Sequence, residues 1–499
     1  MKDSKAAKSA LWSAVENGGL ALVSFTSLVI YSRFLSASDF GLFSIVLAVV
    51  ELLSVLVSML FHDALVQKQQ LTRLHFDSAF SFSLTLSLVL VAGCVLVRPL
   101  FAQLVANETA SYALCWAALA LPCTACTASI VAQQRRELAF RPLALRSLVG
   151  RLSGAAVGIS LVSLGVGFWA LVAQHVLIAS MGSLALWLSA SARPRFRWGT
   201  AELRQLLGFG AFAVAGLLST FAVKRVFTIL VGVLLGSEAA GYLNLGLRAV
   251  DMLWAIAATA VTQVALPVLA RLQNDPQRLE RTYQSALGLS CLLLYPCFLG
   301  IAAVAPEVVE LLFGRRWLSA APYVTALGVL IVLQVPRLLV TTLLMALGRP
   351  RAALVGGVFE LTLMLGLMLC VGSRSLTWAM GVWVLREILV APVMALVLHR
   401  ATGIGPRQQL RATVGPLLAS ASMLAAVYAF RHVLPGGLSV GVRLPLLAAL
   451  GAGVFGAGAW LMDRASVLRG LGFAAAALRR AHSAPEPAAH PTPAAASRI

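Results

Sequence analysis

Long apolar segments follow one another along most of the chain, with short polar stretches between them. Fourteen of these segments, from Ala10 to Met462, have roughly the 17 to 25 residues that a helix needs to cross a bilayer. Their apolar residues run continuously instead of alternating with polar ones, which excludes a membrane β-barrel. The pattern therefore predicts an all-α polytopic membrane protein. The predicted spans are residues 10–34, 40–60, 76–97, 109–131, 145–166, 168–190, 208–235, 242–266, 282–304, 320–346, 351–371, 376–398, 414–430 and 442–462.

The composition agrees with this pattern. Hydrophobic residues make up 60% of the chain, charged residues only 12%, and the mean hydropathy is +0.88. These values lie outside the usual range of soluble globular domains. The short loops contain no nucleotide-phosphate loop, nucleophile elbow or metal-ligand spacing. We therefore expect a protein that is not an enzyme and that uses no metal ion and no cofactor.

The net charge of +20 is explained by basic residues between the spans, whose distribution indicates the orientation of the protein in the membrane. With the N-terminus placed in the cytoplasm, the inner segments hold 26 basic residues and the outer segments hold seven. Such an excess of Lys and Arg marks the cytoplasmic side of a membrane protein. We therefore expect an even number of spans with both termini in the cytoplasm, and we expect no nucleic-acid partner.

Two pairs of short segments indicate an internal repeat. Phe34–Phe43, between the first two spans, resembles Leu234–Leu243, between the seventh and eighth spans, at an offset of 200 residues. Arg141–Pro142 and Arg349–Pro350 match at an offset of 208 residues and follow the fourth and tenth spans. A six-helix repeat would place both matches there, and parallel repeats in transporters enclose the substrate site between them. Chance similarity among apolar turns is the alternative.

Several motifs occur in the same order as in one family of transporters. They are Arg33–Ser36 with Asp39–Leu42, Ala64–Thr72, Arg141–Ser147, Trp169–Gln174, Leu266–Gln273 and Ala346–Pro350. Through them, about residues 10 to 430 resemble the polysaccharide-transporter branch of the multidrug/oligosaccharidyl-lipid/polysaccharide flippase superfamily, the lipid-linked oligosaccharide flippases. The resemblance implies two six-helix lobes around a central cavity, plus two terminal helices.

The resemblance also implies a substrate and a cell location. It implies a flippase of the bacterial inner membrane that moves undecaprenyl-pyrophosphate-linked oligosaccharide between leaflets by alternating access. The product would serve exopolysaccharide or lipopolysaccharide synthesis. The implied partners are this lipid-linked oligosaccharide, the lipid bilayer, and a polysaccharide polymerase with its export machinery. The chain departs from the family where Lys224-Arg225 is followed by Phe227 instead of an acid, which leaves the position of a coupling carboxylate open.

The spans and the resemblance together predict how the chain is divided. The expected parts are a cytoplasmic N-terminus (1–9), a first lobe (10–190), a cytoplasmic inter-lobe linker (191–207), a second lobe (208–398), a cytoplasmic loop (399–413), two terminal helices (414–462) and a disordered cytoplasmic tail (463–499).

Six basic residues lie inside predicted spans, where an Arg or Lys facing lipid costs on the order of 2.5 to 3.5 kcal/mol. They must therefore face water or a partner, and a pyrophosphate is an anion that both residue types bind. Arg151, near the inner end of its span, is expected to reach the interface and to be structural. The predicted substrate-binding residues are Lys224, Arg225, Arg248, Arg337 and Arg386. In the alternative, these bases only neutralise Asp251, Glu360 and Glu387.

Adjacent residues on a helix point about 100° apart, so Lys224 and Arg225 cannot face the same spot. We expect Arg225 to contact the pyrophosphate and Lys224 to turn toward an acid such as Asp251 or Glu360. Arg248 and Asp251 are three residues apart and can pair with each other.

Carboxylates inside the spans are candidates for ion coupling. Glu16 and Glu51 lack a basic partner in their own spans, and a carboxylate in a medium of low dielectric constant can take up a proton. Glu51 is the better candidate, and Asp251 and Glu360 complete the set. The alternative for Glu51 is a permanently protonated side chain that is hydrogen-bonded to a neighbour. Proton, sodium and no coupling ion all remain open.

Two other functions remain open at this stage. One is a drug or small-molecule exporter of the same superfamily, against which a cationic cavity argues. The other is a membrane-embedded sugar-transferring enzyme, for which the short loops leave little room.

Overall fold

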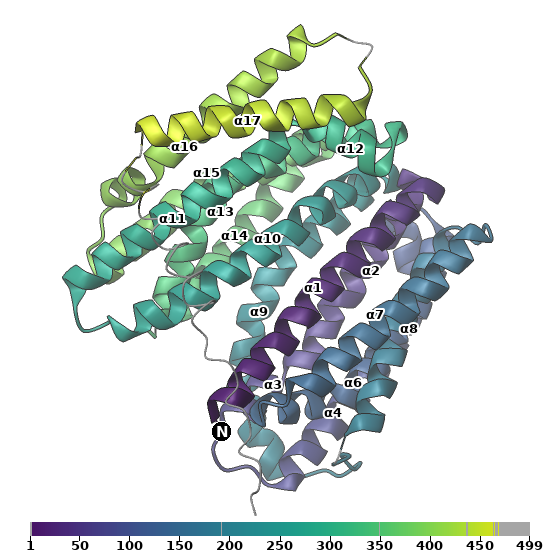
Figure 1. Ribbon diagram of the computed structural model, residues 1–499. Helices are drawn as coiled ribbons and strands as arrows, with labels where there is room; N and C mark the ends of the chain where they lie inside the picture. Colours follow the sequence, from purple (N-terminus) through teal and green to yellow (C-terminus); the bar gives the residue numbers. More distant parts are fainter. Residues whose placement is uncertain are drawn as a thin grey trace, which may run out of the picture.

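The computed structural model describes residues 2–190, 192–348, 350–435 and 438–462, together with Arg464 and Leu468 (Figure 1). For residues 2–17, 209–213, 220 and 350–355 it describes the backbone alone. All regular secondary structure in the described part of the chain is helical. The predicted all-α architecture is therefore confirmed, while the predicted tail (463–499) lies outside the described residues except for Arg464 and Leu468.

The helices follow the chain in two groups. The first half consists of α1 (Lys2–Phe34), α2 (Ala37–Met59), α3 (His62–Gln67), α4 (Arg73–Val105), α5 (Glu108–Ala118), α6 (Ala120–Arg136), α7 (Phe140–Ser163) and α8 (Phe168–Ser189). The second half consists of α9 (Thr200–Leu235), α10 (Ser237–Arg271), α11 (Pro276–Ala303), α12 (Ala305–Phe313), α13 (Ala321–Ala346), α14 (Pro350–Cys370) and α15 (Leu376–Thr402). The last two helices are α16 (Pro406–Val433) and α17 (Val440–Met462).

Apart from at most three residues at either end, every predicted span lies on a helix or, for residues 109–131, on the consecutive helices α5 and α6. Within the described residues, 12 helical stretches are long and apolar enough to cross a membrane. α1 and α14 add the shorter apolar stretches Gly18–Phe34 and Gly356–Cys370. The protein is thus a multi-pass membrane protein, and the count of fourteen spans stays a prediction.

Polar residues at the ends of the apolar runs set where several helices begin. At α2, the backbone N–H of Ser36 donates to Asp39 Oδ2 (3.0 Å) and the N–H of Asp39 donates to Ser36 Oγ (3.2 Å). This reciprocal cap satisfies two of the N–H groups that a helix start leaves without partners. At the equivalent start of α10, Gly236 adopts a φ of 90°, which a glycine reaches without steric cost.

The two halves meet where α2 packs against α9 and α10. Near the start of both helices the contact is reciprocal: a Cβ at Gly41 would collide with the carbonyl oxygen of Ser237, and one at Gly241 would collide with that of Ala37. The hydroxyls of Ser38 and Ser237 lie 2.7 Å apart at the same crossing. The contacting residues are related by the offset of 200 found in the sequence, so the two motifs of the repeat pack on each other.

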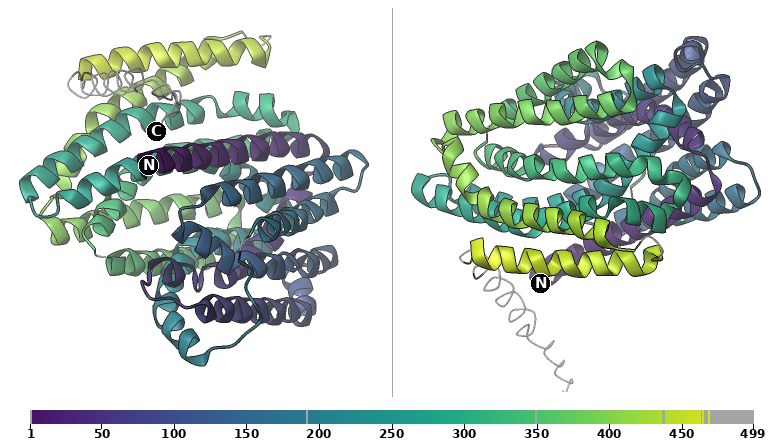
Figure 2. Two further views of the ribbon diagram at one scale, coloured as in Figure 1. Left: turned by 60° about the horizontal axis from the view of Figure 1, so that its bottom comes forward. Right: turned by 90° about the horizontal axis from the view of Figure 1, so that it is seen from above.

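α9 also contacts the first half at its N-terminal end. Leu203 and Leu206, both in its first two turns, are buried in a cluster with Phe61 and Leu65. The predicted linker 191–207 is therefore helical from Thr200 onward. α16 and α17 lie outside this core, where α16 packs on α11 and α17 packs on α16 (Figure 2).

Candidate functional site

A cavity of about 400 Å³ lies between the two halves. Its wall comes from α1, α2, α7 and α8 on one side and from α9 and α10 on the other. Four basic and two acidic side chains line it, so the wall carries two more positive than negative groups. These side chains are Glu51, Arg151, Lys224, Arg225, Arg248 and Asp251.

Lys224 and Arg225 diverge, as their adjacency on α9 requires. The Lys224 ammonium forms an ion pair with Asp251 of α10, in its own half. The Arg225 guanidinium turns to the other half, where its Nη2 lies 2.5 Å from Glu51 Oε2 on α2. The prediction that Lys224 turns toward an acid is confirmed.

The structure also shows how these residues pair, while their roles in substrate binding and ion coupling stay predictions. Arg225 does not stand free for a ligand, because Glu51 already binds it. Glu51 in turn has a basic partner, which sequence inspection missed because it comes from a distant span. Asp251 pairs with Lys224 and not with Arg248.

The positive surplus of the cavity is carried by Arg248 and Arg151. Among the described residues, neither has a carboxylate oxygen within ion-pair distance. The Arg248 guanidinium lies 5.9 Å from the centre of the Phe43 ring, and Arg151 Nε has no hydrogen-bond partner in the described part of the chain. The side chain of Arg151, which was expected to reach the interface, lies in the cavity wall instead.

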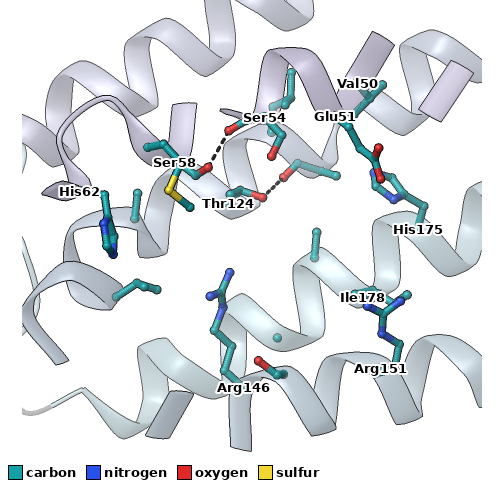
Figure 3. Close-up of a pocket in the computed structure, with 18 of the residues that line it drawn as sticks. Val50, Glu51, Ser54, Ser58, His62, Thr124, Arg146, Arg151, His175 and Ile178 are labelled. Atoms are coloured by element: carbon teal, nitrogen blue, oxygen red, sulfur yellow. Dashed lines mark hydrogen bonds between the residues drawn. The ribbon is translucent and has the colours of Figure 1, made fainter. Parts of the chain in front are cut away.

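A second cavity of about 380 Å³ adjoins the first inside the first half, lined mainly by α2, α6, α7 and α8 (Figure 3). The two cavities share Glu51, Arg151 and His175 in their walls. Arg146 and Arg151 rise from the same helix in this view, facing the serines of α2. At the far end His62 Nε2 lies 3.3 Å from Arg135 Nη1. A polar path therefore leads from the central cavity toward the loop after α2.

His175 was missed in the sequence, although a signal for it existed. It is the one histidine inside the predicted spans, and an ionisable residue in a membrane span marks a functional site by default. The structure places it on α8 in the wall of both cavities. Nε2 of His175 is buried and has no hydrogen-bond partner among the described residues.

The other predicted site residues form a separate cluster in the second half. Arg337 lies 2.8 Å from Glu360 and 3.0 Å from Glu387, and Arg386 lies 3.0 Å and 2.9 Å from the same two acids. The Arg386 guanidinium also stacks 3.7 Å from the centre of the Trp383 ring. None of these residues lines the central cavity. The expectation that all five bases share one cavity is therefore wrong.

Arg337 and Arg386 instead agree with the alternative, in which the bases neutralise Glu360 and Glu387. Two positive and two negative side chains satisfy each other there, so the cluster carries no net charge.

Glu16 falls among the residues whose side chains are not described. Within the described chain, no group of three His, Cys, Asp or Glu side chains is placed to hold a metal ion.

Comparison with known proteins gives consistent relatives. A family model described as "Polysaccharide biosynthesis protein" matches residues 30–322. The succinoglycan biosynthesis transport protein ExoT of Rhizobium meliloti (strain 1021) is 25% identical over 313 residues, which are 62% of this chain and 63% of that protein. The lipopolysaccharide biosynthesis protein WzxC of Escherichia coli (strain K12) is 23% identical over 450 residues, 87% of this chain and 89% of that protein. The match to ExoT thus spans slightly less than two thirds of that relative.

Among solved structures, the lipid II flippase MurJ in an inward closed conformation is similar to this protein. The TM-score is 0.74 at 13% identity, with 91% of this chain and 99% of that chain covered. A likeness at this identity shows a common fold. The helices of this chain are therefore arranged as in that solved structure.

Proposed function

The chain belongs to the polysaccharide biosynthesis protein family, and from this premise we propose that it is a lipid-linked oligosaccharide flippase. Its substrate is an oligosaccharide linked to undecaprenyl pyrophosphate, which it moves from the inner to the outer leaflet of the bacterial plasma membrane. The observation that carries this proposal is the cavity between the halves, whose wall has a surplus of two positive charges on Arg151 and Arg248.

The pyrophosphate group binds between the two halves. Arg151 comes from α7 and Arg248 from α10, so an anion held by both contacts both halves at once. Arginine suits this role because its planar guanidinium donates two parallel hydrogen bonds to phosphate oxygens. The sugar chain occupies the polar space around the pyrophosphate, and the polyprenyl chain stays in the lipid.

Substrate binding also acts on the Glu51–Arg225 ion pair, which joins α2 to α9 across the cavity. A pyrophosphate near Arg225 competes with Glu51 for the guanidinium. The released Glu51 carboxylate then sits in a cavity of low dielectric constant, where protonation stabilises it. Loss of this bridge frees the two halves to move, as alternating access requires.

Orientation and location follow from the charge distribution. The ratio of 26 to seven basic residues between the two sides supports two cytoplasmic termini. The likeness to the lipopolysaccharide biosynthesis protein WzxC of Escherichia coli supports the inner membrane. Since ExoT is named as a transport protein and MurJ as a flippase, we assign transport and not sugar transfer to this chain. A polysaccharide polymerase on the outer face would use the delivered repeat units.

The proposal is tested with purified protein in vesicles. A fluorescent oligosaccharide linked to polyprenyl pyrophosphate is placed in the membrane, and its movement is followed by the fraction that a membrane-impermeant quencher reaches. We expect the protein to speed movement of this lipid and not of the same lipid with an uncharged head group. A fluorescent organic cation serves as the drug-like control. Equal rates for charged and uncharged lipids, or faster transport of the cation, would overturn the proposal.

A further inference from the structure

The segment between α8 and α9 is an extended chain that is fastened along the beginning of α4. The backbone N–H of Arg195 donates to Asp77 Oδ1 at 2.9 Å. Two residues later, the N–H of Arg197 donates to Ser81 Oγ at 2.9 Å, and the hydroxyl of Ser81 lies 3.0 Å from the Arg197 carbonyl oxygen. Side chains of α4 thus replace the partner strand that an extended backbone needs.

The fastening continues to the start of α9. The N–H of Gly199 donates to Ser78 Oγ at 2.8 Å, and Arg73 donates to the carbonyl oxygen of Arg193 at 3.3 Å. Asp77, Ser78 and Ser81 are buried as a result. The segment is therefore a fixed part of the first half.

The side chains of this segment point outward and alternate in character. Arg193, Arg195 and Arg197 are exposed, and Phe196 and Trp198 between and after them are 60% and 48% exposed. The two aromatic rings meet edge to face with their centres 6.0 Å apart. The backbone hydrogen bonds hold three exposed arginines and two exposed aromatic residues within one short segment, which we call the basic–aromatic ledge (residues 193–198).

The ledge lies at the level where the lipid-facing surface of α4 begins. Residues 77–81 of α4 are buried beneath the segment, whereas Leu88 and Val89 are 55% and 60% exposed and apolar. Seven residues separate Ser81 from Leu88, which is roughly 10 Å along a helix. The ledge is thus placed beside the membrane–water boundary and not deep in either phase.

We propose that the basic–aromatic ledge binds the head groups of anionic phospholipids at this boundary. Trp favours the head-group level, Phe inserts at the boundary between head groups and acyl chains, and clustered Arg side chains bind the anionic lipids of the cytoplasmic leaflet. Asp77 is buried and engaged by the Arg195 N–H, so it does not offset the positive charge toward the lipid. Glu202, in the first turn of α9 beside Gly199, is one acid against the three arginines of the ledge. The choice of the cytoplasmic leaflet rests on the orientation given under the proposed function. The preference of the ledge for anionic lipids does not depend on which substrate is transported.

Bound lipid would hold the first half at a fixed depth in the membrane. α9 begins directly after the ledge and carries Lys224 and Arg225 of the cavity. The ledge therefore gives the moving second half a fixed point on the first half.

The test compares two variants of the full-length protein that lose the same charge. In the ledge variant, Arg193, Arg195 and Arg197 are each replaced by Gln; in the control, the exposed Arg400, Arg407 and Arg411 are replaced by Gln. Native mass spectrometry measures the phosphatidylglycerol and phosphatidylcholine retained by each purified protein. We expect the ledge variant to bind phosphatidylglycerol about tenfold or more weakly, the control to stay within about twofold of the original, and phosphatidylcholine binding to be unchanged.

A second variant and a competitor separate the remaining explanations. Arg→Lys at the three ledge positions keeps the charge, and we expect it to retain the preference for phosphatidylglycerol. Millimolar inorganic phosphate should leave lipid binding intact, since the aromatic rings contribute to it. Equal loss in the ledge and control variants would show a general charge effect and overturn the proposal. Complete displacement of the lipid by phosphate would also overturn it, because it would identify a site for free phosphate.

Discussion

The four side chains of the second-half cluster are 0 to 24% exposed, whereas the four paired side chains of the central cavity are 26 to 41% exposed. The two clusters contain the same residue types and both lie within the predicted spans. In the second half, two bases and two acids form four ion pairs with no charge left over. In the cavity, two pairs are accompanied by two arginines without a carboxylate.

The difference shows how an arginine in a span is to be interpreted. A closed, balanced cluster satisfies every charge within the protein, so it offers nothing to a ligand and holds α13, α14 and α15 together. An open cluster with a surplus keeps part of its charge in contact with water and can bind an anion. Charge balance and exposure, and not the presence of a base, therefore separate the balanced cluster from the proposed binding cluster.

The largest expected effect tests the closed cluster. Arg386→Met leaves Glu360 and Glu387 with one guanidinium between them in a buried site. Breaking a buried ion pair on one side costs about 3 to 5 kcal/mol of unfolding free energy. We expect low abundance in the membrane and a lower thermal unfolding temperature in detergent.

A compensating variant sharpens this test. Glu360→Gln in the Arg386→Met background removes the surplus negative charge, so stability should partly recover. If the single variant is as stable as the original, then the cluster does not hold the helices together.

The next effect tests the open cluster. Arg248→Ala removes a base that has no carboxylate partner among the described residues, so stability should change little. Loss of a charge-assisted hydrogen bond costs about 1.5 to 3 kcal/mol, which is roughly ten- to a hundredfold in substrate affinity. We expect lower flipping per molecule at normal abundance, with Arg248→Lys intermediate.

Arg151→Ala should behave in the same way, because the proposed function assigns Arg151 the anion contact from the other half. Flipping and abundance are measured in the same strains, so that a loss of protein is not mistaken for a loss of function. Normal flipping per molecule in both alanine variants would contradict the cationic site.

The smallest effect on stability is expected at the bridge between the halves. The Glu51–Arg225 pair is about one third exposed, and pairs in such surroundings contribute about 0 to 1 kcal/mol. Glu51→Gln should therefore fold normally but weaken transport driven by a pH gradient, since the amide cannot take up a proton. Flipping is measured in vesicles with and without an imposed gradient. An unchanged response to the gradient would show that Glu51 only bridges the halves.

The sequence predicted the helices well because the bilayer requires long apolar runs. It missed the break at Leu119 that divides residues 109–131 into α5 and α6, because the apolar pattern continues through it. The repeat could be recognised at Phe34–Phe43 because the residues that form the turn between the two helices are consecutive in the sequence. The division into lobes at the predicted boundaries stays a prediction.

The site was only partly predictable. The divergence of Lys224 and Arg225 follows from helix geometry and needed no structure. The pairing of Arg225 with Glu51 depends on how α2 and α9 pack, which no local pattern contains. The separation of Arg337 and Arg386 from the cavity also depends on how the helices pack. The sequence does not distinguish a basic residue that faces water from one that faces an acid.

The crossing of α2 and α10 restricts how the two copies of the repeat can change over time. Gly41 and Gly241 each lie against a backbone carbonyl of the other copy, and no substitution makes a backbone carbonyl group smaller. A larger residue at one position cannot be rescued by a smaller residue at the other. Each glycine is therefore required whatever residue occupies the other position. No second substitution at the crossing would compensate for its loss.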